Sequence, residues 1–297
     1  MITSVGFIGL GAMGSGMVRN LLEGDVPVRC YDLNPQAVEA MEAAGASAAQ
    51  SPASVADGAD LIITMLPNAS DVDAVLDGPD GVLAASAGGA LLMNCSTIDP
   101  FEAKRLAEKA AAGGWRYIDC AVGRTATQAA EGKCLFILGG DDADKALVRP
   151  VLEHMGDTIV DGGETGQASS LKIVNNYLAL VSCLATAETL ALAEAAGLSA
   201  DAALQVINGT TARNGNTELN FPNKVLKGDV SPGFPLMHGR KDLGIAVRAM
   251  ERLKVPSFLG ARALDAFDTA LDHGHGSNDC SDILNMLSDL KQEGSGK

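Results

Sequence analysis

The stretch GLGAMG constrains the fold of this chain most, because of its place between a strand and a helix. It follows the apolar run VGFI and opens the helical segment GSGMVRNLLEG, so Gly9, Gly11 and Gly14 have the spacing GxGxxG. The first glycine permits a tight turn, the second lets a pyrophosphate approach the backbone, and the third lets helix and strand pack closely. The spacing therefore predicts a dinucleotide site, which comprises Gly9, Leu10, Gly11, Ala12, Met13 and Gly14.

Asp32 strengthens this prediction, because it ends the next strand-like run, VRCYD. A carboxylate at that position can accept hydrogen bonds from both hydroxyls of the adenosine ribose. It would also repel a 2′-phosphate, and no arginine follows immediately in DLNPQ. The sequence therefore favours NADH over NADPH as the cofactor.

The rest of the chain divides into two parts that differ in their predicted secondary structure. Strand-like runs alternate with helical patterns as far as WRYIDCAV, KCLFILGG and DTIVDGG, which is typical of βαβ units on a parallel sheet. Only helical stretches follow, and the first is the long run SSLKIVNNYLALVSCLATAETLALAEAAG. We expect an α/β Rossmann-type, doubly wound domain at residues 1–163, joined by a long interdomain helix to an all-α domain at residues 164–297.

Composition argues against several classes of partner. The net charge of −15 leaves no basic stripe for nucleic acid or an anionic membrane. The 6 cysteines lack CxxC spacing and the 4 histidines lack HExxH spacing, so no metal is expected. The opening MITSVGFIGLGAMG has no cationic segment before a short apolar run, and we therefore expect a cytoplasmic protein.

A candidate catalytic group lies on the long helix. Lys172, Asn175 and Asn176 project from one side of it, because they are three and four residues apart. A lysine there can hold a carbonyl oxygen by a charge-assisted hydrogen bond and protonate it as a hydride arrives. The residues alone leave a second interpretation open, in which a solvent-facing or ion-paired lysine is followed by two ordinary helix amides.

Five motifs together resemble the β-hydroxyacid dehydrogenases, the family that contains 3-hydroxyisobutyrate dehydrogenase. They are GLGAMGSGMVRNL, ITMLPN, CSTIDP, KIVNNY and RKDLGIA, in this order over nearly the whole chain. The resemblance implies a Rossmann domain, a helical domain that takes part in oligomerisation as a homodimer or homotetramer, and a cleft between them that binds a small hydroxyacid or aldehyde. It also implies that Lys172 is the catalytic acid and base.

The same resemblance assigns further residues. Leu66, Pro67 and Asn68 would line the cofactor, Thr97 would meet its nicotinamide side, and Lys241 would approach the nicotinamide. The substrate would face Ser96, Gly123, Asn175 and Asn176. Asp242 is equally readable as a structural ion-pair partner of Lys241.

One loop departs from the family pattern and bears on the substrate. The family has an aspartate, a proline and a valine followed by serine-glycine-glycine, and this chain has DCAVGRT. Ala121 therefore replaces the proline, and Gly123, Arg124 and Thr125 replace serine-glycine-glycine. This loop resembles the branch that reduces 3-sulfolactaldehyde with NADH. A guanidinium fork can bind two of the three sulfonate oxygens, which makes Arg124 and Thr125 candidate substrate contacts.

Three further positions depart from the family pattern, and the residues allow other functions. Ala168 replaces a glycine of the family, Asn94 replaces an aspartate, and Ala179 replaces a serine expected in the sulfolactaldehyde branch. Arg124 has two other interpretations, an interdomain salt bridge or a clamp for a carboxylate. The alternative enzymes are a 3-hydroxyisobutyrate dehydrogenase and a 4-hydroxybutyrate (succinic semialdehyde) dehydrogenase, and the alternative from another class is a non-catalytic dinucleotide-binding module.

Overall fold

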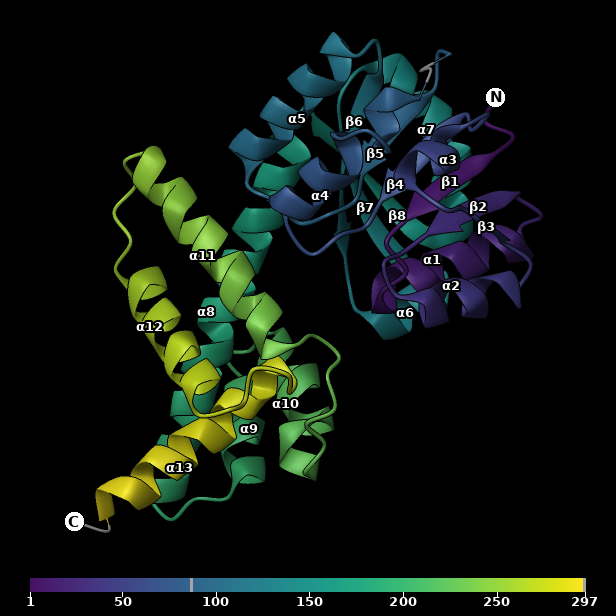
Figure 1. The fold of residues 1–297 in the computed structure, drawn as a ribbon. Coiled ribbons are helices and arrows are strands. Elements are labelled where there is room, and N and C mark those ends of the chain that lie inside the picture. Colours follow the sequence, from purple (N-terminus) through teal and green to yellow (C-terminus); the bar gives the residue numbers. More distant parts are fainter. Residues whose placement is uncertain (86–87, 296–297) are drawn as a thin grey trace. The chain divides into compact units, whose positions relative to one another are not determined.

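The computed structural model describes residues 1–85 and 88–295 and divides the chain into two compact units (Figure 1). Unit 1 is Met1–Lys172 and unit 2 is Ile173–Lys297. The division falls inside helix α8 (Gln167–Ala195), whose first residues belong to unit 1. A boundary inside a continuous helix has no glycine or proline signal in the sequence, which is why the sequence suggests the loop before it instead.

Unit 1 is built on one eight-stranded sheet with the order β3-β2-β1-β4-β5-β6-β7-β8. The strands are β1 (Val5–Ile8), β2 (Val28–Tyr31), β3 (Ser47–Ala48), β4 (Leu61–Thr64), β5 (Leu91–Asn94), β6 (Arg116–Gly123), β7 (Cys134–Gly139) and β8 (Gly156–Gly163). All neighbours pair in parallel except β6 and β7. This order, reversing beside β1, is the doubly wound topology expected from the sequence.

The antiparallel step has a local cause. Only residues 124–133 separate β6 from β7, and a single short helix, α6 (Ala126–Ala130), lies between them. A parallel return needs a crossover of a dozen or more residues. The short connection therefore turns β7 back along β6.

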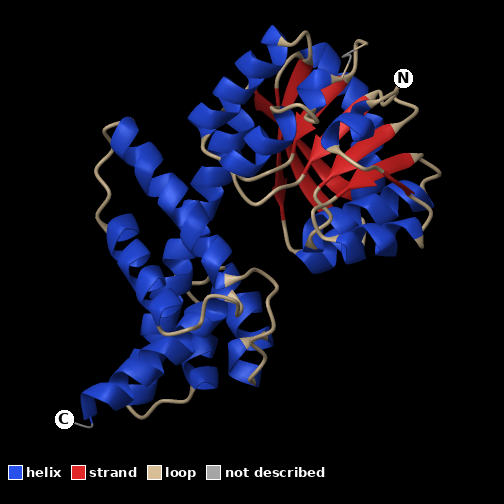
Figure 2. Cartoon of the chain, viewed as in Figure 1, coloured by secondary structure: helices blue, strands red, loops and turns tan. Residues whose placement is uncertain are grey.

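Helices cover both faces of this sheet (Figure 2). Helices α1 (Ala12–Glu23), α2 (Pro35–Glu42), α6 and α7 (Asp142–Met155) share one hydrophobic core with the sheet, and α3 (Pro52–Ala56), α4 (Ala69–Leu76) and α5 (Pro100–Ala112) share the other. Successive strand residues alternate between them: Phe7 joins the first core and Ile8 the second. Burial on both faces explains why these strands read as continuous apolar runs.

Unit 2 is helical among its described residues. It contains the larger part of α8, then α9 (Ala200–Asn208), α10 (Phe221–Asn223), α11 (Leu236–Arg252), α12 (Leu259–Asp272) and α13 (Ile283–Ser295). Helix α8 is long and apolar enough to cross a membrane by length and composition alone. Its residues Leu180, Cys183 and Ala187 instead pack in a buried core with Leu243 and Phe267.

Candidate active site

The glycine turn between β1 and α1 has the shape that a pyrophosphate requires. Gly9 has φ +101°, and a Cβ there would lie 2.3 Å from the carbonyl oxygen of Met65. A Cβ on Gly14 would lie 1.9 Å from the carbonyl oxygen of Gly9, so helix and turn are in direct contact. A Cβ on Gly11 would meet no described atom within 4 Å, which leaves open space in front of the turn. The residues present therefore fit a dinucleotide.

Asp32 lies beside this turn, and its carboxylate is already oriented by backbone donors. Its Oδ2 accepts a hydrogen bond from the amide of Leu10 at 2.6 Å, and its Oδ1 accepts one from the amide of Asn34 at 2.8 Å. Each carboxylate oxygen can accept a second hydrogen bond. Asp32 can therefore hold the turn and receive ribose hydroxyls with the same two oxygens.

The other candidate residues of unit 1 lie along the same sheet edge. The turn follows β1, Leu66–Asn68 follow β4, Ser96 and Thr97 follow β5, and 123–125 end or follow β6. Because these strands are mutually parallel, their carboxyl ends meet at one edge. The register also shows that β6 continues past the last residue of β5, since Asn94 pairs with Asp119.

Buried polar side chains connect the loops after β4 and β5. Asn94 Oδ1 accepts hydrogen bonds from Thr64 Oγ1 at 3.0 Å and from the amide of Ser96 at 3.1 Å. The hydroxyl of Ser96 then accepts one from the amide of Leu66 at 2.9 Å. Ser96 is only 1% exposed, so its observed contact is structural, and its contact with substrate stays a prediction.

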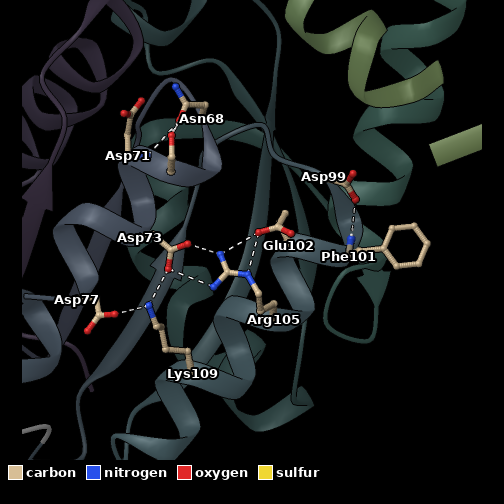
Figure 3. A network of polar contacts seen from close by, with 10 residues as sticks. Asn68, Asp71, Asp73, Asp77, Asp99, Phe101, Glu102, Arg105 and Lys109 are labelled. Carbon is tan, nitrogen blue, oxygen red and sulfur yellow. Dashed lines mark hydrogen bonds and ion pairs between the residues drawn. The ribbon is translucent and has the colours of Figure 1, made fainter. Parts of the chain in front are cut away.

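An ionic network joins the helices that follow those two loops (Figure 3). Asp73 of α4 pairs with Arg105 and Lys109 of α5, and Lys109 also contacts Asp77 at 2.7 Å. Partial burial favours the neutral form of Asp73, but the hydrogen bonds from Arg105 and Lys109 outweigh it and lower the pKa of Asp73. The network therefore holds α4 against α5.

Asn68 is engaged at the start of α4, where its Oδ1 accepts a hydrogen bond from the backbone amide of Asp71.

Arg124 has partners within its own unit. Its guanidinium lies 2.7 Å from Oδ1 of Asp157 and donates hydrogen bonds to the carbonyl oxygen of Lys133 at 2.6 Å and to Thr158 Oγ1 at 3.0 Å. The hydrogen bond between Arg124 and Asp157 raises the pKa of the arginine and lowers that of the aspartate. Asp157 is the second residue of β8, so the ion pair that the structure shows for Arg124 lies within unit 1. Thr125 is also engaged, since its hydroxyl donates a hydrogen bond to Gln128 Oε1 at 3.2 Å.

The start of α8 is anchored by a residue that sequence reasoning missed. Asp119, inside β6, accepts hydrogen bonds from the backbone amides of Gly166 and Ser169 and from the Ser169 hydroxyl. Lys172 lies in the next turn of that helix. The available signal was a single acid inside the apolar run YIDCAV.

Two departures from the family pattern lie in the same buried cluster. Ala121 and Ala168, which replace a proline and a glycine, belong to one small buried cluster with Ile137. Neither side chain carries a polar group. Both exchanges therefore lie in apolar packing at the start of α8.

In unit 2, a chain of hydrogen bonds joins three of the candidate residues. The side-chain Nδ2 of Asn175 donates to Asn176 Oδ1 at 3.0 Å, and Asn176 Nδ2 donates to Asp242 Oδ2 at 2.7 Å. Lys241 Nζ lies 2.9 Å from the other oxygen of Asp242, which is 2% exposed as a residue. Asp242 is thus the shared partner of Asn176 and Lys241.

Burial lowers the pKa of His238, which lies one turn earlier in α11, and the charge of Lys241 adds to this effect.

Among the described residues, no group of three or more His, Cys, Asp or Glu side chains has an arrangement that could hold a metal ion.

Comparison with known proteins agrees with this architecture. Residues 4–163 match the model of the NAD binding domain of 6-phosphogluconate dehydrogenase. Residues 166–287 match the model described as the NAD-binding domain of NADP-dependent 3-hydroxyisobutyrate dehydrogenase. The two matches correspond to the Rossmann part and the helical part.

Whole proteins of similar length are also similar. The 3-sulfolactaldehyde reductase of Escherichia coli (strain K12) is 38% identical over 286 residues, 96% of each chain. The 3-hydroxyisobutyrate dehydrogenase of Pseudomonas aeruginosa is 36% identical over 295 residues, 96% of this chain and 98% of the other. The structure of Mycobacterium tuberculosis 3-hydroxyisobutyrate dehydrogenase with L-serine has a TM-score of 0.88 and 31% identity, over 97% of this chain and 99% of that one. Family models, relatives and fold together show that this chain belongs to the β-hydroxyacid dehydrogenases, the nicotinamide-dependent family that includes the 3-hydroxyisobutyrate dehydrogenases.

Proposed function

We propose that this chain is an NADH-dependent reductase that converts 3-sulfolactaldehyde to 2,3-dihydroxypropane-1-sulfonate, a step of sulfoquinovose degradation. The observation that carries the proposal is the loop Gly123, Arg124, Thr125, in which an arginine replaces the middle glycine of the family's serine-glycine-glycine. The similarity to the Escherichia coli 3-sulfolactaldehyde reductase supports it.

The backbone at Arg124 supports a specialised role. Its φ is +76°, in the left-handed region that a glycine adopts without strain. The chain therefore retains a glycine-like turn at a position where an arginine is strained. A side chain kept in such a conformation is a reasonable candidate for function.

The chemistry of a sulfonate suits this residue. A sulfonate stays ionised at physiological pH and offers three oxygens, of which a guanidinium fork can take two. Thr125 and Asn175 could supply a hydrogen bond to the third. Binding would require Arg124 to share or exchange its contacts with Asp157 and the carbonyl oxygen of Lys133.

Catalysis would use Lys172 as the general acid. A bound NADH supplies the hydride to the carbonyl carbon. The ammonium of Lys172 donates a hydrogen bond to the carbonyl oxygen and then transfers a proton to it. Ser96, Asn175 and Asn176 would orient the aldehyde, and Leu66–Asn68, Thr97 and Lys241 would contact the cofactor.

Preference for NADH rests on Asp32. Its carboxylate would accept hydrogen bonds from the ribose hydroxyls and repel the 2′-phosphate of NADPH. The exposed side chain after it, Leu33, offers no cation to that phosphate.

The quaternary state and location belong to the same proposal. We expect a homodimer or homotetramer in the cytoplasm. Several large apolar side chains of unit 2 are exposed, which is a feature of surfaces that a second copy covers: Val174, Leu178, Leu192, Val206 and Phe258. Light scattering coupled to size exclusion would test this, and a monomer at micromolar concentration would contradict it.

Two alternatives stand beside the main proposal. A dehydrogenase for 3-hydroxyisobutyrate or 4-hydroxybutyrate is supported by the 3-hydroxyisobutyrate dehydrogenase of Pseudomonas aeruginosa, which is 36% identical. A non-catalytic dinucleotide-binding module is the other, and the presence of Lys172, Asn176 and Lys241 argues against it.

One steady-state comparison distinguishes these possibilities. Purified full-length protein is assayed with NADH and with NADPH against 3-sulfolactaldehyde, methylmalonate semialdehyde, succinic semialdehyde and tartronate semialdehyde. The proposal expects the highest kcat/KM for 3-sulfolactaldehyde with NADH. A higher kcat/KM for a carboxylate aldehyde would assign the carboxylate alternative, and no turnover with any of them would favour the binding module.

A further inference from the structure

Asp119 is a buried acid that the proposed reaction does not use directly. It lies in the middle of β6 and is only 1% exposed. A charge in such a place is costly unless partners satisfy it. Its partners therefore indicate why an acid stands at this position in a strand.

All three of its hydrogen bonds come from the start of α8: one from Gly166, the residue before the helix, and two from Ser169 in its first turn. Oδ2 accepts from the backbone amides of Gly166 at 3.0 Å and Ser169 at 2.9 Å, and Oδ1 accepts from the Ser169 hydroxyl at 2.7 Å. Burial raises the pKa of Asp119, while these three hydrogen bonds oppose that rise. The carboxylate thus satisfies amides at a helix start that would otherwise lack acceptors.

The surrounding backbone leaves this turn little freedom. A Cβ on Gly139 would lie 2.6 Å from the carbonyl oxygen of Glu164, and one on Gly162 would lie 3.1 Å from the Cα of Ala168. The side chain of Ala168 is fully buried. The ends of β7 and β8 therefore pack directly against the helix start that Asp119 binds.

Lys172 lies three residues after Ser169, which places the two side chains on the same side of the helix in successive turns. We infer that Asp119 is a positioning residue for Lys172: by binding Gly166 and Ser169, it sets the position and rotation of the helix turn that carries the lysine. This inference rests on the proposed role of Lys172 as the general acid. A displacement of about 1 Å at a reacting group can lower a rate by about 100-fold.

The test is Asp119→Asn in the full-length chain. Asparagine has one acceptor oxygen and no charge, and its Nδ2 meets the Ser169 hydroxyl as a donor where Asp119 offers an acceptor, so the charge-assisted character of all three hydrogen bonds is lost. We expect kcat, expressed per titrated NADH site, to fall about tenfold or more. The Kd of NADH should stay within about twofold of wild type, because the glycine turn and Asp32 are untouched. Counting NADH sites removes any contribution from unfolded protein.

Asp60→Asn is the matched control. Asp60 also accepts hydrogen bonds from two backbone amides and one hydroxyl: the amides of Thr3 and Ser4 at 2.7 and 3.2 Å, and Thr3 Oγ1 at 2.7 Å. It precedes β4 and therefore lies at the opposite edge of the sheet from the candidate site. Its kcat per site should equal that of wild type.

A second variant covers the case in which Asp119→Asn does not fold. Ser169→Ala removes only the hydroxyl contact and should lower kcat per site by about two- to fivefold, with an unchanged Kd for NADH. Wild-type kcat in Asp119→Asn would overturn the inference. A loss of kcat in Asp119→Asn that is matched by a loss of NADH binding, or that is equally large in Asp60→Asn, would also overturn it. Where only Ser169→Ala folds, an unchanged kcat in that variant would overturn it.

Failure of the proposed function is recognised separately. If wild-type protein reduces none of the aldehydes, the proposed function fails, and hydrogen exchange of residues 164–172 then decides the positioning role. Faster exchange there in Asp119→Asn, with unchanged exchange in α1, supports it. Unchanged exchange at residues 164–172 overturns it.

Discussion

Replacing Arg124 by glycine separates its two possible roles most sharply. Glycine restores the residue type that tolerates φ +76° and removes the guanidinium together with its contacts to Asp157, Lys133 and Thr158. Alanine would be a poorer choice, because it keeps the backbone strain.

The expected effects on stability and on catalysis have opposite signs. Relief of a left-handed residue should raise Tm by about 2 to 4 °C. Loss of an ion pair whose side chains are 27% and 50% exposed should lower it by less than that. If the guanidinium binds the substrate anion, kcat/KM for 3-sulfolactaldehyde should fall by about 30-fold or more, the usual minimum when one partner of a buried charge pair is truncated.

The assay follows NADH oxidation with 3-sulfolactaldehyde, succinic semialdehyde and the uncharged glyceraldehyde. Arg116→Ala is the control, because Arg116 begins the same strand and also pairs with an aspartate, Asp144. A sulfonate contact predicts a large loss for 3-sulfolactaldehyde, a smaller loss for succinic semialdehyde and almost none for glyceraldehyde. Equal losses for all three aldehydes, or a fall in Tm with unchanged kinetics, would refute it and leave Arg124 as a structural partner of Asp157.

Three further predictions concern the cofactor, the catalytic group and the ionic network. Lys172→Ala should abolish turnover while fluorescence titration gives a nearly unchanged Kd for NADH, and substantial residual activity would contradict its role as general acid. Asp32→Asn should raise the Kd of NADH by about 10- to 100-fold through loss of charge-assisted hydrogen bonds to the ribose, and it should reduce the preference for NADH over NADPH. An unchanged ratio of the two Kd values would argue against a contact between Asp32 and the ribose. Because Arg105 and Lys109 lower the folded-state pKa of Asp73, its contribution to stability is present above the unfolded pKa of about 4 and is lost as pH falls through the lower folded value. Thermal melts at pH 7, 4 and 2.5 should therefore show a smaller acid-induced loss of Tm for Asp73→Asn than for wild type, and an identical loss would contradict this assignment.

The parts of the site that depend on neighbouring residues in the chain were readable from sequence. The turn between β1 and α1 is one example: the glycine spacing predicted a tight turn and an open approach, and the positive φ of Gly9 and the open space at Gly11 agree with it. The strands of unit 1 and the long helix α8 were also anticipated, because hydrophobic periodicity reports burial along a single element. The two-residue strand β3 was missed because it has too few residues to form a pattern.

Partners that lie far apart in the chain were not readable. Asp119 lies 47 and 50 residues from the amides it accepts, and Asn176 lies 66 residues from Asp242. Arg124 likewise meets Asp157 only because β6, β7 and β8 are neighbours in the sheet.

The sequence by itself thus determined the class of fold, the family and the residues that carry the proposed chemistry. The tertiary structure decided which of those residues already have partners, and it revealed the acid that anchors the helix of Lys172. The physical reason is that a hydrophobic pattern records only which side of an element is buried. The partner of a buried polar side chain depends on which elements pack beside it.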